Sequence, residues 1–334
     1  MSSFRRARLL ALLLLAGCAS LPLFRGDDAW WAFTAPWDAR SAESLRAHSA
    51  ALDVAVTGWI ALDSLSGRPT LLFADTVPVA ASVRRFALVT SWMGDRFHPD
   101  VVRRLAVDTA ALSAAANGVR ALVGGEGIAN GVRYQGVVLD LEGLAPGDLP
   151  ALVRVTSTLA RAARAGGART IAVAVPALDT VGYPIAPLLA DADVALVMLY
   201  DEHWANSEPG PIASPDFVRR ALGIRVAEAG ASRLVAALPL YGYQWRPGRA
   251  TRVVGWDDAT REAGAAGQNL IRDPGTATLR ARRTRESGDP WELWVSDAAL
   301  VDSLAGIARA SGIRTFALWH LGLEDPALWR DVVR

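Results

Sequence analysis

Short apolar runs alternate with longer alanine-rich stretches along most of this chain, and this alternation constrains the fold more than any other feature. Eight of the runs have the length and composition of buried strands. Most are apolar without interruption, as strands covered on both faces are. The expected strands are Ala29–Phe33, Val54–Ala61, Phe86–Ser91, Gly136–Glu142, Ile171–Val175, Val194–Tyr200, Leu234–Leu238 and Thr315–Trp319.

Helix signals fall between these runs. We expect Ser41 to open one helix and Asp148 to precede another, and Ser296 to open the last long one. The stretch SPD that begins at Ser214 supplies an N-cap, a first-turn proline and an acid that suits the helix dipole. Eight strands with intervening helices over about 300 residues predict an α/β fold, the (β/α)8 or TIM barrel. A doubly wound open sheet is the alternative, but no GxGxxG motif follows the first strand.

The connection between the seventh and eighth strands is much longer than an ordinary loop. It runs from Tyr241 to Val295, whereas such loops normally have roughly 2–6 residues. The stretch also carries four tryptophans, Trp245, Trp256, Trp291 and Trp294. We therefore expect a small inserted subdomain over about residues 241–295, beside the mouth of the barrel.

The N-terminus has the features of a bacterial lipoprotein signal. Three arginines precede the apolar run Leu9–Leu15, which is shorter than the ~20 residues that span a bilayer. The run closes on LAGC, which resembles the lipobox, whose cysteine is lipidated and becomes the new N-terminus. Its Cys18 is the single cysteine of the sequence, and an ordinary signal peptide with a chance cysteine is the alternative. We expect a signal peptide over residues 1–17, a tether over 18–28 and the barrel over 29–334, in a protein exported and anchored to a membrane of the cell envelope.

Charge gives no support for a polyanionic partner. Arginine supplies all 35 basic side chains, and 34 acidic residues nearly cancel them, which leaves a net charge of +1. Neither nucleic acid nor an anionic membrane surface is therefore indicated as a partner. The hydrophobic fraction of 51% in 334 residues is instead enough for one large barrel or two smaller domains.

The fourth expected strand ends in two acids. Residues 134–142 read YQGVVLDLE, so side chains alternate between two faces. Val138, Asp140 and Glu142 share one face, and the intervening apolar residues share the other. Two acids on one face of a buried strand are costly unless water or a ligand meets them. This pair is therefore a site candidate.

Other strand ends bring more polar and aromatic groups to the same rim, because the chemistry of such barrels lies at the carboxyl ends of the strands. The sixth strand runs into MLYDEH from Met198, the seventh into PLYGY, and the eighth ends at Trp319. Each residue alone has a structural explanation, such as a helix cap or a core aromatic. Together, carboxyls and aromatic faces are what a sugar site needs. His203 and His320 lack the spacing of metal ligands, and the absence of GxSxG argues against a serine hydrolase with a nucleophile elbow, so we expect no metal and no cofactor.

From about Trp30 to Trp329 the chain resembles glycoside hydrolase family 18, in its bacterial cell-wall and spore-cortex branch, which also occurs fused to polysaccharide deacetylases. The motifs that carry the resemblance are WDARSAESLRAHSAALDVAVTGWIAL, LVMLYDEHWANSEPGP, LPLYGYQW and FALWHLGLEDPALW. The last three, in this order, are the specific ones.

The resemblance implies a substrate-assisted retaining hydrolysis of β-linked N-acetylglucosamine glycans, either peptidoglycan or a chitin-like polymer. Glu142 would be the general acid, and Asp140 would orient and charge-stabilise the attacking 2-acetamido group of the substrate. Tyr200 would bond the same acetamido group, and Trp319 would form the floor of the sugar subsite. The remaining substrate-binding residues would be Met198, Asp201, Tyr241, Trp37 and Asp38.

The acidic signature of this family, Asp-Gly-x-Asp-x-Asp-x-Glu, is incomplete in this chain. Gln135 and Val138 replace its first two acids, and Thr34 stands where a rim tyrosine is common. A family acid at position 138 would hydrogen-bond Asp140, which valine cannot do. A catalytically inactive, lectin-like glycan-binding barrel is therefore an alternative. A structural lipoprotein that uses the insertion as a protein interface is another.

Overall fold

The computed structural model describes residues 28–126 and 131–333. The expected signal peptide, Cys18 and the tether up to residue 27 lie outside the described residues. Among the helices that are described, none is both long and apolar enough to cross a bilayer.

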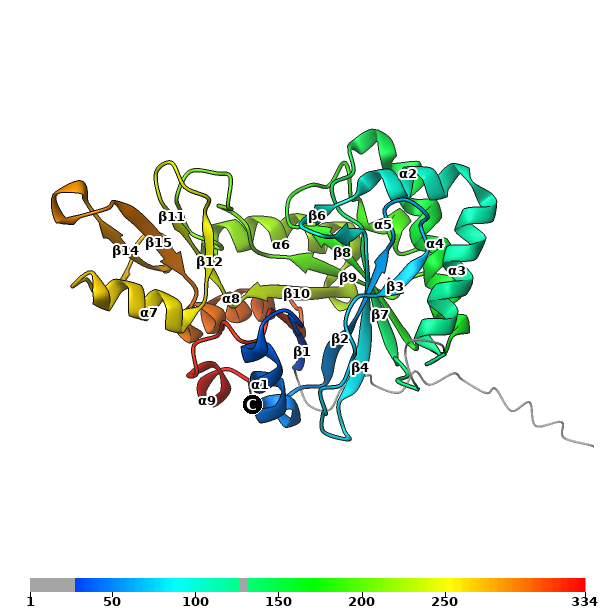
Figure 1. Cartoon of the computed structure of the whole chain (residues 1–334), viewed down its shortest axis with the longest axis horizontal. Helices are drawn as coiled ribbons and strands as arrows, with labels where there is room; N and C mark the ends of the chain where they lie inside the picture. Colours follow the sequence, from blue (N-terminus) through cyan, green and yellow to red (C-terminus); the bar gives the residue numbers. More distant parts are fainter. Residues whose placement is uncertain (1–27, 127–130, 334) are drawn as a thin grey trace, which may run out of the picture.

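Eight parallel strands close into a barrel, as the alternation of apolar runs predicts (Figure 1). Their order around the barrel is β1, β16, β10, β9, β8, β7, β4 and β2, and pairing of β1 with β2 closes the ring. The strands are β1 (Ala29–Phe33), β2 (Val54–Leu62), β4 (Arg84–Thr90), β7 (Gly136–Asp140), β8 (Thr170–Pro176), β9 (Val194–Met198), β10 (Leu234–Pro239) and β16 (Thr315–Trp319).

Helices surround the barrel, with one gap in the ring. They are α1 (Ala39–His48), α2 (Pro99–Val107), α3 (Thr109–Val123), α4 (Leu149–Ala165), α5 (Ile185–Leu188), α6 (Pro215–Ala229), α8 (Ala298–Ala310) and α9 (Leu328–Asp331). Between β2 and β4 there is no helix, contrary to the simple alternation. That connection contains β3 (Pro69–Leu71), which pairs antiparallel with β2, and an extended segment that packs Val77 and Val79 against the core.

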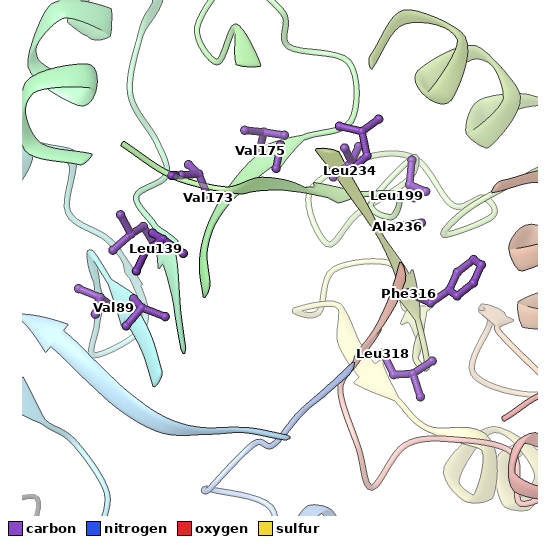
Figure 2. Packing of buried hydrophobic residues seen from close by; sticks show 14 of the residues in the cluster. Val89, Leu139, Val173, Val175, Leu199, Leu234, Ala236, Phe316 and Leu318 are labelled. Atoms are coloured by element: carbon purple, nitrogen blue, oxygen red, sulfur yellow. The ribbon is translucent and has the colours of Figure 1, made fainter. Parts of the chain in front are cut away.

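The strand faces separate two apolar layers. Outward-facing residues of successive strands, including Val89, Leu139, Val173, Ala236 and Leu318, point away from the ring toward the helices (Figure 2). The inward layer is asymmetric. The first strands contribute large side chains such as Trp31, Trp59 and Phe86, and the later strands contribute mostly alanines, such as Ala172, Ala174, Ala237 and Ala317. Large groups from one side therefore fill space that small groups leave on the other, as close packing requires.

The expected insertion is a five-stranded antiparallel sheet between β10 and α8. Its strands are β12 (Arg252–Val254), β11 (Gly242–Trp245), β15 (Trp291–Val295), β14 (Leu279–Arg283) and β13 (Ile271–Arg272), in that order, and α7 (Trp256–Ala265) packs against it. The sheet lies beyond the carboxyl end of β10 (Figure 1). A two-stranded ribbon, β5 (Trp92–Met93) with β6 (Arg96–Phe97), follows β4.

Several expected boundaries were wrong by one to three residues. The strands that carry the site end earlier than expected, β7 at Asp140 and β9 at Met198. Helix α1 is capped by Asp38 and not opened by Ser41, because the Ser41 hydroxyl accepts a hydrogen bond from the Ala35 N–H. Helix α8 is likewise capped by Asp297, one residue after the expected Ser296. The Ser214 cap of α6 and the proline after it are as expected.

Candidate active site

A cavity of about 500 Å³ opens at the carboxyl ends of the barrel strands, and we call it the barrel cavity. Six of the residues expected at the site line it: Asp140, Glu142, Met198, Tyr200, Asp201 and Trp319. Five acidic residues and one arginine are among its lining residues, so its charge is predominantly negative. The acids that sequence reasoning did not assign to a site are Asp179 and Glu202, and the arginine is Arg220.

The two faces of β7 separate as the alternation predicts. Val137, Leu139 and Leu141 belong to the outer apolar layer. Val138 belongs to the inner layer and lines the barrel cavity together with Asp140 and Glu142. The apolar face thus fixes the strand, and this fixes the direction in which both carboxyls point.

Burial raises the pKa of the Asp140 carboxyl to about 6. Hydrogen bonds with Glu142 and Thr90 lower the pKa, but their effect is smaller. Its side chain is only 7% exposed. Oδ2 accepts a hydrogen bond of 3.1 Å from the Thr90 hydroxyl, whereas Oδ1 accepts none of normal geometry within the described residues. The Glu142 carboxyl is near enough to affect the pKa of Asp140, so the two carboxyls form one titrating unit.

Burial is also the main cause that raises the pKa of Glu142 well above its ordinary value, and the negative charges of Asp140 and Asp201 add to it. A carboxyl in this environment holds its proton toward neutral pH. Glu142 can therefore donate a proton under conditions in which an exposed glutamate is ionised.

Thr90 was not singled out by the sequence, although it lies within an expected strand. It is the last residue of β4 and pairs in register with Asp140 across the parallel ladder. Val138, where the family pattern has an acid, is buried in the inner layer beside Leu88 and Ala172. The hydrogen bond that Val138 cannot supply thus comes from the neighbouring strand.

Asp201, which follows β9 and also lines the barrel cavity, is held by two tyrosine hydroxyls. Its Oδ1 accepts hydrogen bonds from Tyr241 at 2.5 Å and from Tyr243 at 3.2 Å. Its φ of 58° lies in the left-handed region, which is uncommon for a residue with a side chain and typical of functional sites. Burial raises the pKa of Asp201, and the two hydroxyls lower it. Tyr241 therefore acts through Asp201, and it is not among the lining residues of the barrel cavity.

Aromatic rings line one side of this region. Trp319 is stacked at 6.3 Å and 16° with Tyr200, and it contacts Phe33 edge-on at 5.2 Å. Trp37 lies next to this group, edge-on to Trp59 at 4.8 Å, and is 51% exposed. An exposed ring beside a buried aromatic group is the arrangement that stacks against the apolar face of a sugar.

Asp38 lies outside the barrel cavity. Its carboxylate caps α1 and pairs with Arg40 at 2.7 Å, and these contacts lower its pKa. The side chain is thus already engaged with its own helix, and the structure gives it a capping role.

A second group that the sequence did not indicate holds the backbone around Glu142. The Tyr183 hydroxyl donates to the Leu141 carbonyl at 3.1 Å and accepts from the Leu144 N–H at 3.2 Å. Arg225, fully buried on α6, donates in turn to the carbonyls of Tyr183 at 3.0 Å and of three other residues, Pro176, Ala177 and Asp179. Because its partners are backbone atoms distant in sequence, no spacing rule could have pointed to this network.

In the part of the chain that the structure describes, no three histidine, cysteine or acidic side chains lie close enough together to bind a metal ion. His203 and His320 each have a ring nitrogen at hydrogen-bond distance from a backbone carbonyl.

Comparison with known proteins places the chain near bacterial glycosylases. No family model matches the sequence. The Bacillus subtilis protein YdhD, named as a sporulation-specific glycosylase, is 25% identical over 257 residues, which cover 74% of this chain and 60% of YdhD. The chain therefore spans less than two thirds of the length of that relative.

Solved structures share the fold. A class V chitinase from Pseudomonas fluorescens Pf-5 superposes with a TM-score of 0.78 at 21% identity, over 91% of this chain and 98% of the other. The spore cortex-lytic enzyme SleL of Bacillus megaterium superposes with a TM-score of 0.76 at 16% identity, over 91% and 72% of the two chains. These likenesses confirm the (β/α)8 barrel.

Proposed function

We propose that this chain is a glycoside hydrolase of the family 18 type that cleaves β-linked N-acetylglucosamine glycan by a substrate-assisted, retaining mechanism. The observation that carries the proposal is the pair of carboxyls with raised pKa values, Asp140 at the end of β7 and Glu142 two residues beyond it, which both line the barrel cavity. Similarity to YdhD and the shared fold with chitinases and a cortex-lytic enzyme support it.

The position of the two carboxyls suits an internal nucleophile. In the common retaining hydrolases the two carboxyls face each other across the sugar, about 5–5.5 Å apart. Here Asp140 ends β7 and Glu142 follows two residues later, and the two interact directly, so they approach the substrate from one side. The nucleophile then comes from the substrate itself, as its 2-acetamido oxygen.

Each residue has a defined part in this reaction. Glu142 gives its proton to the glycosidic oxygen as the bond to the anomeric carbon breaks. Asp140, oriented by Thr90, stabilises the positive charge that develops on the acetamido nitrogen as the acetamido oxygen bonds to that carbon. Glu142, now a carboxylate, takes a proton from a water molecule that attacks the anomeric carbon. This attack breaks the bond between that carbon and the acetamido oxygen, and the configuration at the anomeric carbon is retained.

A glycan-binding barrel without catalysis is the second candidate. It is favoured by the apolar surroundings of Val138, which leave Asp140 without a third carboxyl beside it. The Thr90 hydrogen bond and the raised pKa of Glu142 weigh against it, since binding alone needs neither.

Lipid anchoring through Cys18 is part of the same proposal and rests on the LAGC sequence. Cys18→Ser should abolish lipid attachment and move the protein out of the membrane fraction. A wild-type protein that is already soluble after cell fractionation would contradict the anchor.

Digestion of purified peptidoglycan and of chito-oligosaccharides, followed by mass spectrometry of new reducing ends, tests the activity. Product should appear with at least one of these N-acetylated substrates, and none should appear when the 2-acetamido carbonyl is missing. If oligosaccharides bind but no product forms over a broad pH range, the glycan-binding candidate replaces the enzyme.

A further inference from the structure

A second cavity of about 480 Å³ lies between the β9–α6 loop and the inserted sheet, and we call it the arginine cavity. Four arginines line it, Arg246, Arg249, Arg282 and Arg283, together with two glutamates, Glu208 and Glu292. Its lining is therefore positive, whereas that of the barrel cavity is negative.

The two cavities are connected by the same pieces of chain. Asp201 and Glu202 line the barrel cavity, and residues 205–209 of the same loop line the arginine cavity. On β11, the Tyr243 hydroxyl donates to Asp201, and Trp245, two residues further along the strand, lines the arginine cavity. A row of rings marks the path: Tyr200 to Tyr241 at 6.1 Å, Tyr241 to Tyr243 at 5.5 Å, and Tyr243 to Trp245 at 5.5 Å.

Two of the arginines are available to a ligand. Arg246 is engaged with Glu262 at 3.1 Å, and Arg283 has a partner of its own. Among the residues that the structure describes, Arg249 has one ion-pair partner, the exposed Asp289 at 3.3 Å; both side chains are more than 60% exposed, and such pairs are weak. Arg282 forms no ion pair in the described part of the chain, where its cross-strand neighbour Glu292 accepts instead from the Trp294 indole.

The aromatic part of the lining has an unused donor. Trp245 is 8% exposed, and its indole N–H has no acceptor among the described residues. Buried donors of this kind are nearly always paired. Together with the ring of Trp291 and the guanidinium groups of Arg249 and Arg282, it suits a ligand with an apolar sugar face and an anionic oxygen.

We propose that the arginine cavity binds the carboxylate-bearing substituent of an acidic glycan, the lactyl ether or peptide carboxylate of a muramic acid unit. The proposal rests on the proposed function, because the same oligosaccharide places an N-acetylglucosamine unit in the barrel cavity. It assigns the substrate to peptidoglycan and not to neutral chitin. A chain of N-acetylglucosamine alone offers nothing for Arg249 or Arg282 to neutralise.

Binding measurements test the proposal without requiring hydrolysis. Isothermal titration of Glu142→Gln would use a tetrasaccharide of alternating N-acetylglucosamine and N-acetylmuramic acid, and the same tetrasaccharide with its carboxylates converted to methylamides. The acid form should bind about tenfold more tightly, since a hydrogen bond to a charged group contributes at about this level. A second substitution in this protein, Arg282→Gln, should remove most of the preference for the acid form. The control substitution Arg46→Gln, which changes an exposed arginine on α1, should leave the preference unchanged.

Equal affinity for the acid and the methylamide would overturn the proposal, and so would a preference that survives both Arg282→Gln and Arg249→Gln. The outcome is separate from that of the proposed function. If wild type releases no product while the acid form is still preferred, the hydrolase fails and the anionic subsite stands.

Discussion

The barrel cavity and the arginine cavity lie along one row of aromatic rings, but their charged groups differ in sign and in exposure. The barrel cavity holds carboxyls whose pKa values are raised mainly by burial. The arginine cavity holds guanidinium groups that reach water, and solvent screens their interactions. A buried charge strongly affects both the catalysed reaction and the stability of the protein, because little solvent screens it. An exposed charge changes mainly the affinity for a ligand, and by a smaller amount. We therefore expect substitutions to have graded effects, with the largest in the barrel cavity.

Glu142→Gln should have the largest effect, because it removes the proton donor and keeps the size of the side chain. A general acid contributes typically ~10²–10⁴-fold, so kcat should fall by about that much. Affinity for oligosaccharide should stay near that of wild type, as measured by titration. The alkaline limb of the pH–rate profile, which follows the raised pKa of Glu142, should disappear as well. Unchanged turnover in this variant would remove Glu142 from the mechanism.

The barrel and the position of the acid pair followed from the sequence for a physical reason. Strand β7 alternates strictly between apolar and site-facing residues, and a barrel brings the ends of all such strands to one rim. Met198 and Trp319 were expected at the site because they stand at strand ends and match the family motifs, and both line the cavity. Local patterns were thus sufficient wherever one strand alone determines where a side chain points.

The supporting residues could not be predicted in this way. Thr90 meets Asp140 only because β4 and β7 pair in a particular register, and Arg225 binds carbonyls more than 40 residues away. The cap at Asp38 was missed because Ser41 offered a similar local signal, and the Ala35 N–H that occupies its hydroxyl is a contact of the folded state. Contacts of this kind depend on register and packing, which a single sequence does not display.

Asp140→Asn should stabilise the protein at neutral pH while it slows turnover. Asp140 has a folded-state pKa of about 6 against 3.8 ordinarily, so the folded protein binds the proton more tightly than the unfolded chain. The contribution of protonated Asp140 to the free energy of unfolding is therefore fully present below about pH 4 and is lost as the pH rises through 6. Two pKa units correspond to about 3 kcal/mol, and the variant should recover much of that at pH 7.5 and little at pH 4.

Chemical denaturation at the two pH values measures this difference. Glu43→Gln, an exposed carboxylate on α1, is the control and should be nearly neutral at both. A variant that is less stable than wild type at pH 7.5 would mean that Asp140 is satisfied as a charge in the folded protein.

Tyr183→Phe should come next, because it removes the hydroxyl that bridges the Leu141 carbonyl and the Leu144 N–H on either side of Glu142. Two buried backbone groups lose their partner, at about 1–3 kcal/mol for such groups. We expect kcat to fall about tenfold with KM little changed, since Glu142 is displaced and the sugar contacts remain. Tyr134→Phe, two residues before β7, is the control, because it removes a buried hydroxyl that has no hydrogen bond of normal geometry among the described residues. If both variants lose stability alike and neither changes kcat, Tyr183 has a structural role only.

Thr90→Val should have a smaller effect on turnover, which acts through Asp140, and it also removes the hydroxyl oxygen that accepts from the Trp92 N–H at 3.0 Å. The Thr90 hydroxyl lowers the pKa of that carboxyl, and valine has the same shape without the donor. The pKa of Asp140 should therefore rise, and the acid limb of kcat/KM should move upward by about one pH unit, the equivalent of a 1.4 kcal/mol interaction. Thr90→Ser keeps the hydroxyl and should restore the wild-type profile. An unshifted limb in Thr90→Val would mean that another group orients Asp140.

Arg249→Gln should have the smallest effect and is the sharpest test of the contrast between the cavities. Its guanidinium is 64% exposed, so its attraction for a carboxylate on the ligand passes partly through water. Exposed charge pairs are weak, and affinity for the anionic tetrasaccharide should fall only about two- to fivefold at low salt. At 1 M salt, where the screening length is about 3 Å, wild type and variant should bind alike. The effect of Thr90→Val should persist at the same salt concentration, because Thr90 and Asp140 are buried and bond each other directly. A loss for Arg249→Gln that is large and independent of salt would mean that the arginine cavity closes over its ligand and shields this charge from solvent.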